Sequence, residues 1–211
     1  ALNAQSTTAY DLAGNVTAST DFAGATTTFL YDTANRLTSV TDALAHTTTY
    51  GYDADGRQTS VTDPLNHTAN FAYSSRSSRI SQTDALGNQT TFAYDPAGNR
   101  TGVTNALNQT TSFAYDDLNR LTTITDPLTH TTTFAYDAAG NQTSVTDANN
   151  HTTTFAYSPR SSRISETDAL NGVTQYGYDA AGNRTTVTDP KNATWTYTFN
   201  AHNQQEQLTQ P

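Results

Sequence analysis

The sequence predicts an all-β protein built from tandem β-hairpins, and three observations lead to that prediction. The first is a strict period, because an aromatic residue recurs every 21 positions from Tyr10 to Phe199, with no insertion or deletion. The second is composition: roughly one residue in five is Thr, which fits a pleated strand. The third is the alternation of apolar and polar residues at period two, with nothing recurring at helical spacing.

Each 21-residue unit is expected to run strand, turn, strand, turn, as in the copy Thr131–His151. Phe134 and Tyr136 lie on one side of the first strand and Ala135 on the other, and the second strand alternates in the same way over 143–147. The segments DAAGN and DANNH between the strands are dense in turn formers. A unit therefore predicts one hairpin and one connection to the next hairpin.

Two columns of residues are expected to carry the repeat. Gly stands four residues after the aromatic in alternate copies, where a short hairpin turn needs a residue at positive φ. The intervening copies carry Asn, the next best residue there, or Ser at Ser77 and Ser161, whose turns we expect to be irregular. The candidate structural residues are Tyr10, Tyr31, Tyr52, Tyr73, Tyr94, Tyr115, Tyr136, Tyr157 and Tyr178, with Gly14, Gly56, Gly98, Gly140 and Gly182.

The repeats also predict the domain organisation. Residues 1–211 are expected to form a single continuous array of ten units, with a Thr ten residues after each aromatic. The segment SSRSSRIS after Tyr73 returns as SPRSSRIS after Tyr157, which gives a superperiod of 84 residues. Both ends cut the repeat at the same phase, so we expect the chain to be a window of a longer array.

Stability is expected to come from neighbouring hairpins. A lone two-stranded hairpin is marginal in water, and each unit offers few apolar side chains. Stacking would place Tyr beside Tyr and Thr beside Thr, and each such cross-strand pair contributes roughly 0.2–1 kcal/mol. The sequence therefore predicts self-packing of repeats, with ladders of identical residues in place of a conventional core.

Composition and charge exclude several functions. The absence of Cys excludes disulfides, a thiol nucleophile and Cys-ligated zinc. A net charge of −9, with basic residues scattered singly, disfavours a nucleic-acid partner. No apolar run approaches the ~18 residues of a membrane span, so we expect a soluble region.

The patterns YDAAGNRT at Tyr178, YDPAGNRT at Tyr94, YDADGRQT at Tyr52 and YDTANRLTSVTD at Tyr31 resemble the YD repeat of the Rhs family. The resemblance covers all ten units. It implies a hairpin array that spirals into a hollow shell, as in Rhs proteins, insecticidal toxin complexes and teneurins, and in the toxin members the shell encloses a toxin. The strict period departs from the family pattern and favours an elongated open tube over a closed capsule.

Candidate chemical sites are weaker than their structural interpretations. Asp53, Asp55, Asp137 and Asp147 stand for Asp columns that offer oxygen ligands for Ca²⁺, but a turn Asp usually bonds its own backbone. His46, His67, His130 and His151 each precede an aromatic by six residues and could pair between units, although surface turn positions are the favoured interpretation.

The remaining candidates are equally open. The pairs Arg76 with Arg79 and Arg160 with Arg163 either grip a partner chain or are solvated, and solvation is favoured. Ser, His and Asp recur without a unique constellation, so we expect no enzyme and no cofactor. Asn-x-Thr sequons arise by chance in so Thr-rich a repeat.

Three functions compete. The leading hypothesis is a structural wall, that of a secreted or cell-surface filament or tube. The first alternative is a segment of an Rhs shell around a cargo polypeptide. The second is a flat Thr array that binds ice or glycans, suggested by the TTT runs at Thr26, Thr47, Thr131 and Thr152.

Overall fold

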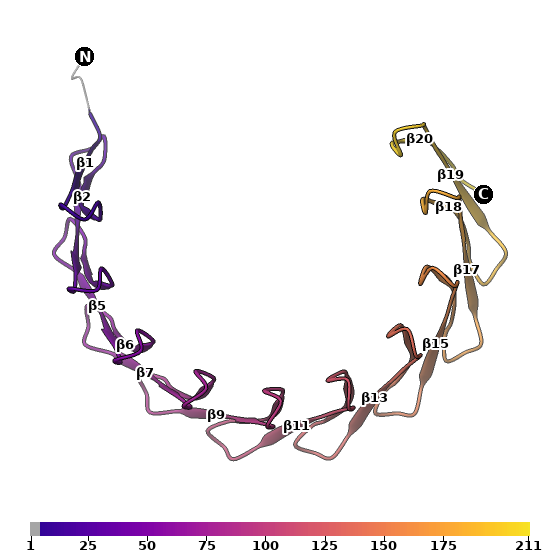
Figure 1. Ribbon diagram of the computed structural model, residues 1–211, viewed down its shortest axis with the longest axis horizontal. Coiled ribbons are helices and arrows are strands. Elements are labelled where there is room, and N and C mark those ends of the chain that lie inside the picture. The colour runs from indigo at the N-terminus through magenta and orange to yellow at the C-terminus, as the bar shows by residue number, and fades with distance from the viewer. Residues whose placement is uncertain (1–4) are drawn as a thin grey trace. The chain divides into compact units, whose positions relative to one another are not determined.

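The computed structural model describes residues 5–211, and all the regular structure within them is β-strand. The chain divides into two compact units, Ala1–Thr110 and Thr111–Pro211. The first unit holds β1 (Thr7–Tyr10), β2 (Val16–Thr20), β3 (Thr26–Tyr31), β4 (Leu37–Thr41), β5 (Thr47–Tyr52), β6 (Gln58–Thr62), β7 (Thr68–Tyr73), β8 (Arg79–Thr83), β9 (Gln89–Tyr94) and β10 (Arg100–Thr104) (Figure 1).

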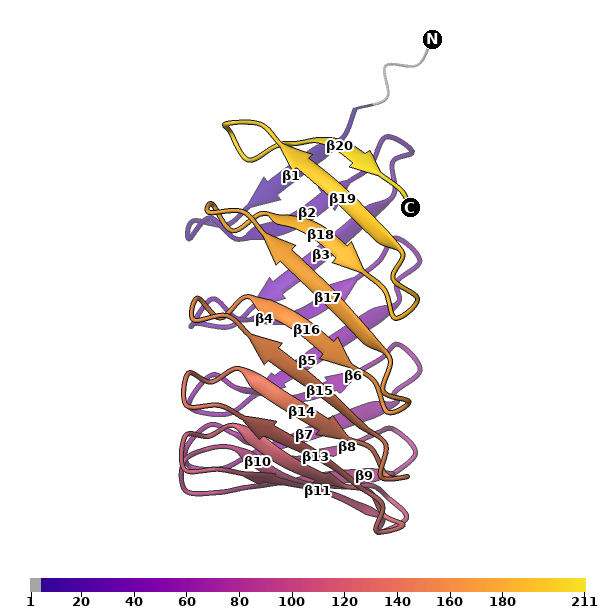
Figure 2. The same cartoon turned by 90° about the vertical axis from the view of Figure 1, so that its right-hand side faces the viewer.

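The second unit repeats the same plan. It holds β11 (Thr110–Tyr115), which begins at the last residue of the first unit, then β12 (Leu121–Thr125), β13 (Thr131–Tyr136), β14 (Gln142–Thr146), β15 (Thr152–Tyr157), β16 (Arg163–Thr167), β17 (Val173–Tyr178), β18 (Arg184–Thr188), β19 (Thr194–Phe199) and β20 (Gln205–Thr209). Strands next to each other in sequence are next to each other in the sheet, as the series β13 to β19 shows in Figure 2.

Within each unit every strand pairs antiparallel with the next, so the sheet is a meander of hairpins. In the hairpin of β13 and β14, Phe134 lies opposite Val145 and Ala135 opposite Ser144, but Tyr136 lies opposite Gln142. Thr143 is the extra residue of a β-bulge, which increases the local twist. All ten pairs that are closed by the loop after the aromatic column carry this bulge. The prediction of an all-β array of hairpin repeats is confirmed.

The register gives the sheet two different faces. The aromatic face carries the side chains of residues such as Phe134, Tyr136 and Val145, and the hydroxyl face carries Thr133 and Ser144 with the Ala column. Along β13 the residues of the aromatic face are half-buried and those of the hydroxyl face are exposed. The aromatic rings are therefore the side chains that neighbouring hairpins cover best.

The described residues contain no buried hydrophobic side chain. Ser39, 8% exposed, is the one buried side chain among them. Because the sheet is a single layer, each hairpin is stabilised by its ladder bonds and by contacts with the hairpins beside it. This agrees with the prediction that ladders of like residues take the place of a core.

Candidate functional site

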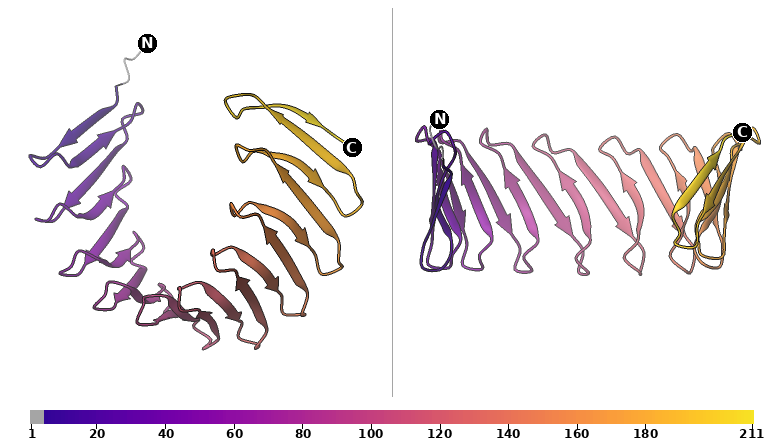
Figure 3. Two further views of the ribbon diagram at one scale, coloured as in Figure 1. Left: turned by 45° about the vertical axis from the view of Figure 1, so that its right-hand side comes forward. Right: turned by 90° about the horizontal axis from the view of Figure 1, so that it is seen from above.

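The loops carry most of the chain's charged residues, and the two ends of each hairpin share one loop design. The first loop follows the aromatic column, as at 137–141, and the second loop follows the Thr column, as at 147–151 (Figure 3). In all nineteen loops the backbone N–H of the first residue donates to the fifth C=O, and the N–H of the fourth donates to the first C=O. The fourth residue is always at positive φ.

The positive φ expected at the glycine column is present, at 83–94° for all seven glycines of this position. Asn fills it in eight loops, as at Asn66 (66°). The expectation that Ser77 and Ser161 make irregular turns was wrong, because both sit at φ near 60° and keep both backbone hydrogen bonds. The geometry also extends to the second loops, where the sequence gave no glycine column to reveal it.

A carboxylate at the first position holds most loops together. In the loop 137–141, Asp137 Oδ1 accepts hydrogen bonds from the N–H groups of Ala139 (2.9 Å) and Asn141 (2.8 Å), and Oδ2 accepts one from Asn141 Nδ2 (2.8 Å). Asp147 does the same with Asn149 N and His151 N. The favoured interpretation of the Asp columns, that they bond their own backbone, is confirmed.

These hydrogen bonds lower the pKa of the loop carboxylates. The Asn141 side-chain amide, opposed by slight desolvation, holds the pKa of Asp137 below its usual value, and the Arg36 backbone N–H does the same for Asp32. Hydrogen bonds and charge from Arg57 lower the pKa of Asp53 although desolvation, the largest single influence, opposes them. Asp55 pairs with the same Arg57 at 2.9 Å.

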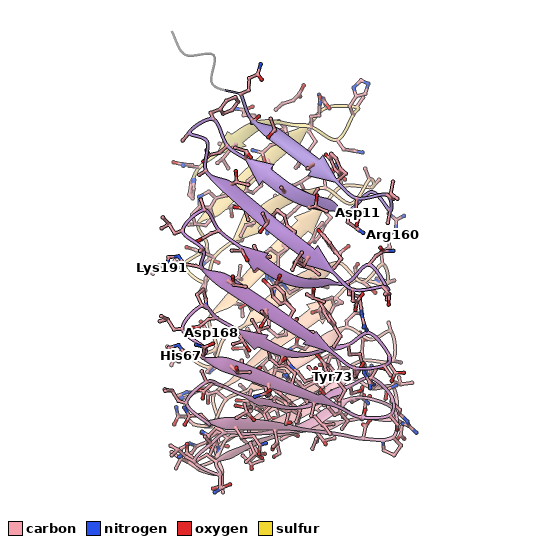
Figure 4. The ribbon with its side chains drawn as sticks, turned by 90° about the vertical axis from the view of Figure 1, so that its left-hand side faces the viewer. Asp11, His67, Tyr73, Arg160, Asp168 and Lys191 are labelled. Carbon is pink, nitrogen blue, oxygen red and sulfur yellow. The ribbon has the colours of Figure 1, made fainter. Side chains whose placement is uncertain are left out.

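The four second-loop histidines lie beside their own loop carboxylates. His67 Nδ1 is 2.9 Å from Asp63 Oδ2, and the His46, His130 and His151 rings make the equivalent contact. Their side chains are 55–64% exposed, which agrees with surface turn positions. Figure 4 shows His67 at the start of β7 and Tyr73 at its end. In residues 5–211 no three metal-ligating side chains come together.

Arg side chains join consecutive first loops. Arg120 Nε donates to Asp116 Oδ2 in its own loop (2.7 Å), while Nη1 donates to the Asp137 carbonyl of the next loop (2.9 Å). The same guanidinium lies 4.8 Å from the centroid of the Tyr136 ring, within cation–π range. The Tyr136 hydroxyl in turn donates to the Leu121 carbonyl (2.9 Å). Arg36 and Arg57 form the same clamp on Tyr52 and Tyr73.

The arginines of the two serine hairpins also act within the chain, an outcome that neither sequence interpretation predicted. Arg76 Nη1 donates to the Pro96 carbonyl, and Arg160 Nη1 to the Ala180 carbonyl. Arg79 lies over the rings of Phe71 and Phe92, at 5.6 and 5.5 Å. Arg163 stacks in the same way on the rings at 155 and 176.

The hydroxyl face is partly occupied by its own hydrogen bonds. The hydroxyls of Thr41 and Thr47 are 2.8 Å apart, and five other Thr pairs repeat this contact. The central Thr of each TTT run is half-buried, and the third, such as Thr133, is exposed. Ice or glycan binding by this face stays a prediction.

One surface feature escaped the sequence analysis. The third residue of the second loop is Leu in six copies, at Leu44, Leu65, Leu86, Leu107, Leu128 and Leu170, and these side chains are 70–89% exposed. Asp168 and Lys191, on the same row of loops in the second unit, lie along one edge of the sheet in Figure 4. The signal was present in the sequence, since Leu recurs three residues after the Thr column.

These features define a tandem β-hairpin repeat protein whose loops and rings are used to hold neighbouring hairpins together. Seven overlapping matches to the RHS Repeat family cover residues 10–47, 31–68, 79–110, 101–131, 115–152, 136–161 and 162–194. The chain therefore belongs to the RHS repeat family, as the YD patterns indicated.

Solved structures show the same fold. The chain is similar to a TcdB2-TccC3-Cdc42 crystal structure, with 17% identity and a TM-score of 0.57 over 97% of this chain and 14% of the other. A TcdB2-TccC3 crystal structure matches with a TM-score of 0.56 at the same identity and coverage. The chain thus spans about a seventh of the length of these proteins. No curated protein matches the sequence.

The chain has a structural role in the sense that its repeats build a sheet by packing on one another. None of the described elements is a helix able to cross a membrane.

Proposed function

We propose that this array is a segment of the wall of an RHS-type shell outside the cell, formed by one continuous run of the ten units around an enclosed polypeptide. The observation that carries the proposal is the absence of a core in the described residues, together with lateral bonding between hairpins. A single-layer sheet of this kind encloses volume without needing a second layer. The family and the fold shared with TcdB2-TccC3 support a shell.

In this role the Tyr and Gly columns carry the wall. The tyrosines end the first strand of each unit, and several reach back to a carbonyl 15 residues earlier, in the preceding hairpin. The glycines permit the tight first loop that lets successive hairpins stack at a constant interval. Neither column needs reactive chemistry, which agrees with a structural rather than an enzymatic role.

A filament or open tube is the second candidate. The observation that favours it is the strict 21-residue period, since a repeated step that does not close generates an open helix. Electron microscopy of the native protein separates the two. Closed hollow particles with internal density are expected for the shell, and uniform tubes with a helical repeat would replace it with the filament. Compact globules or flexible chains would refute both.

A further inference from the structure

The segments SSRSSRIS and SPRSSRIS form the first loops 74–78 and 158–162 and open strands β8 and β16. Four columns change together in these copies. Ser74 replaces the loop Asp, Ser78 takes the position of Arg or Asn, Ile80 replaces a Thr, and Gln82 takes the place of a Val. The second copy makes the equivalent changes 84 residues later. Neither the fold nor the proposed wall requires them.

The linked changes open a hollow on the aromatic face. In the clamped loops, a guanidinium at the fifth loop position covers the next Tyr ring, as Arg36 covers Tyr52 at 4.9 Å. Ser78 is too short to do so, and no described guanidinium stacks on the Tyr94 ring. A hollow of about 420 Å³ results, lined by Ser74, Ser78, Ile80 and Tyr94 among others.

The second copy forms the same hollow independently. It measures about 270 Å³, and its lining includes Ser158, Ser162, Ile164 and Tyr178, the four equivalents of the first set. It is smaller, and Tyr176 stands where the first hollow has Phe92. Two hollows from one motif in separate units make the feature a property of the sequence rather than of one loop.

The chemistry of the lining is apolar with one cation. Ile80 and Ile164 are 39% and 40% exposed, unusual for an aliphatic strand residue, and they lie beside half-buried rings. Arg76 and Arg160 line the mouths, and each guanidinium makes one hydrogen bond, to a backbone carbonyl, and no ion pair. Four of its five N–H donors remain for a ligand.

The one carboxylate in each lining faces its own loop. Asp95 accepts from the backbone N–H and the side-chain amide of Asn99, at 2.8 and 2.9 Å, and Asp179 does the same with Asn183. The Arg charge in each hollow is therefore not paired within the chain. Serine hydroxyls on the wall add neutral donors next to it.

We propose that both hollows bind a carboxylate carried on a compact hydrocarbon body, with the guanidinium of Arg76 or Arg160 on the carboxylate and the Ile and aromatic side chains against the hydrocarbon. Arg recognises a carboxylate through two parallel hydrogen bonds, and small-molecule sites combine an apolar lining with a few polar groups in this way. The ligand is either a free organic acid or the chain end of a peptide that terminates in an aromatic residue.

The chain supplies its own reporters, because its three isoleucines are Ile80, Ile124 and Ile164. With labelled Ile methyl groups, NMR titration with 3-phenylpropionate is expected to shift the Ile80 and Ile164 signals and to leave that of Ile124, in the ordinary strand β12, unmoved. The neutral amide of the same acid is expected to bind at least tenfold more weakly. N-acetylglycyl-phenylalanine tests the peptide source, and the tighter of the two acids identifies it.

Variants assign the cation. Arg76→Gln is expected to weaken binding at Ile80 about tenfold or more and to leave Ile164 responsive, and Arg160→Gln the reverse, so each variant controls for folding of the other hollow. Lys191→Gln makes the same charge change outside both hollows and is expected to alter neither signal. If neither acid moves Ile80 and Ile164 more than Ile124, or if the amide binds as tightly, the proposal is overturned.

Discussion

The fourth loop position offers a reciprocal test of backbone strain. The loops DPLNH (63–67) and DPLTH (126–130) differ only there, with Asn66 at φ 66° and Thr129 at φ 70°. A β-branched residue is strongly disfavoured in the left-handed region, whereas Asn tolerates it. Thr129→Asn is therefore expected to stabilise the protein, and Asn66→Thr to destabilise it by a similar amount.

The magnitude follows from the conformation alone. The left-handed conformation costs an ordinary residue about 1–2 kcal/mol, and Asn recovers part of that cost. Since both loops are exposed and keep the same backbone bonds, about 1 kcal/mol of unfolding free energy is expected in each direction. For a chain of this length that corresponds to about 2–4 °C in Tm.

Urea denaturation followed by circular dichroism measures both changes. Thr133→Asn makes the same substitution on the exposed face of strand β13, where the backbone is extended, and is expected to destabilise slightly because Asn is a poor strand residue. If Thr129→Asn and Asn66→Thr shift the midpoint in the same direction, or if neither shifts it, positive φ at this position does not limit stability.

Three further predictions concern the loops and their clamps. Because hydrogen bonds lower the pKa of the loop aspartates, their stabilisation is complete above the usual value of 3.8 and is lost as the pH falls through the lowered values; urea midpoints at pH 7 and below 4 should differ accordingly, and a flat profile would contradict this. Arg120→Gln is expected to cost about 1 kcal/mol by removing the contact with Tyr136, whereas Lys191→Gln should be near neutral; equal effects would show that the clamp is not stabilising. Tyr136→Phe is expected to cost about 1 kcal/mol with its hydroxyl bond to a carbonyl, and Tyr157→Phe, whose hydroxyl makes no such bond, less; denaturation of both variants compares them.

The period carried most of the fold. Every interval between aromatics is 21, so one correct reading of strand, turn, strand, turn fixed the plan of the array, and the strands of all ten copies follow it. The bulge opposite Tyr136 was not foreseen, because period-two alternation does not show which strand holds an extra residue.

Side-chain partners were harder to foresee than strands. A sequence shows that Arg120 and Tyr136 are 16 residues apart, but only the register places the guanidinium over the ring. The regular turn at Ser77 was missed because residue preference was read without the hydrogen bonds, and Ser74 Oγ, at 3.3 Å from Arg76 N and 3.2 Å from Ser78 N, still occupies the place of the Asp carboxylate. The hollow over Tyr94 arises from what a short side chain leaves uncovered.

The shared loop design has a consequence for how such a chain can change length. Since a strand and its loop form a self-sufficient module at either edge of the sheet, the smallest conservative deletion is not one module but two. Losing a single module would reverse the direction of every later strand and carry the Leu-bearing loops to the opposite edge. An even number of modules keeps each edge chemically uniform, so duplication or loss in whole hairpins preserves the surface while changing the length.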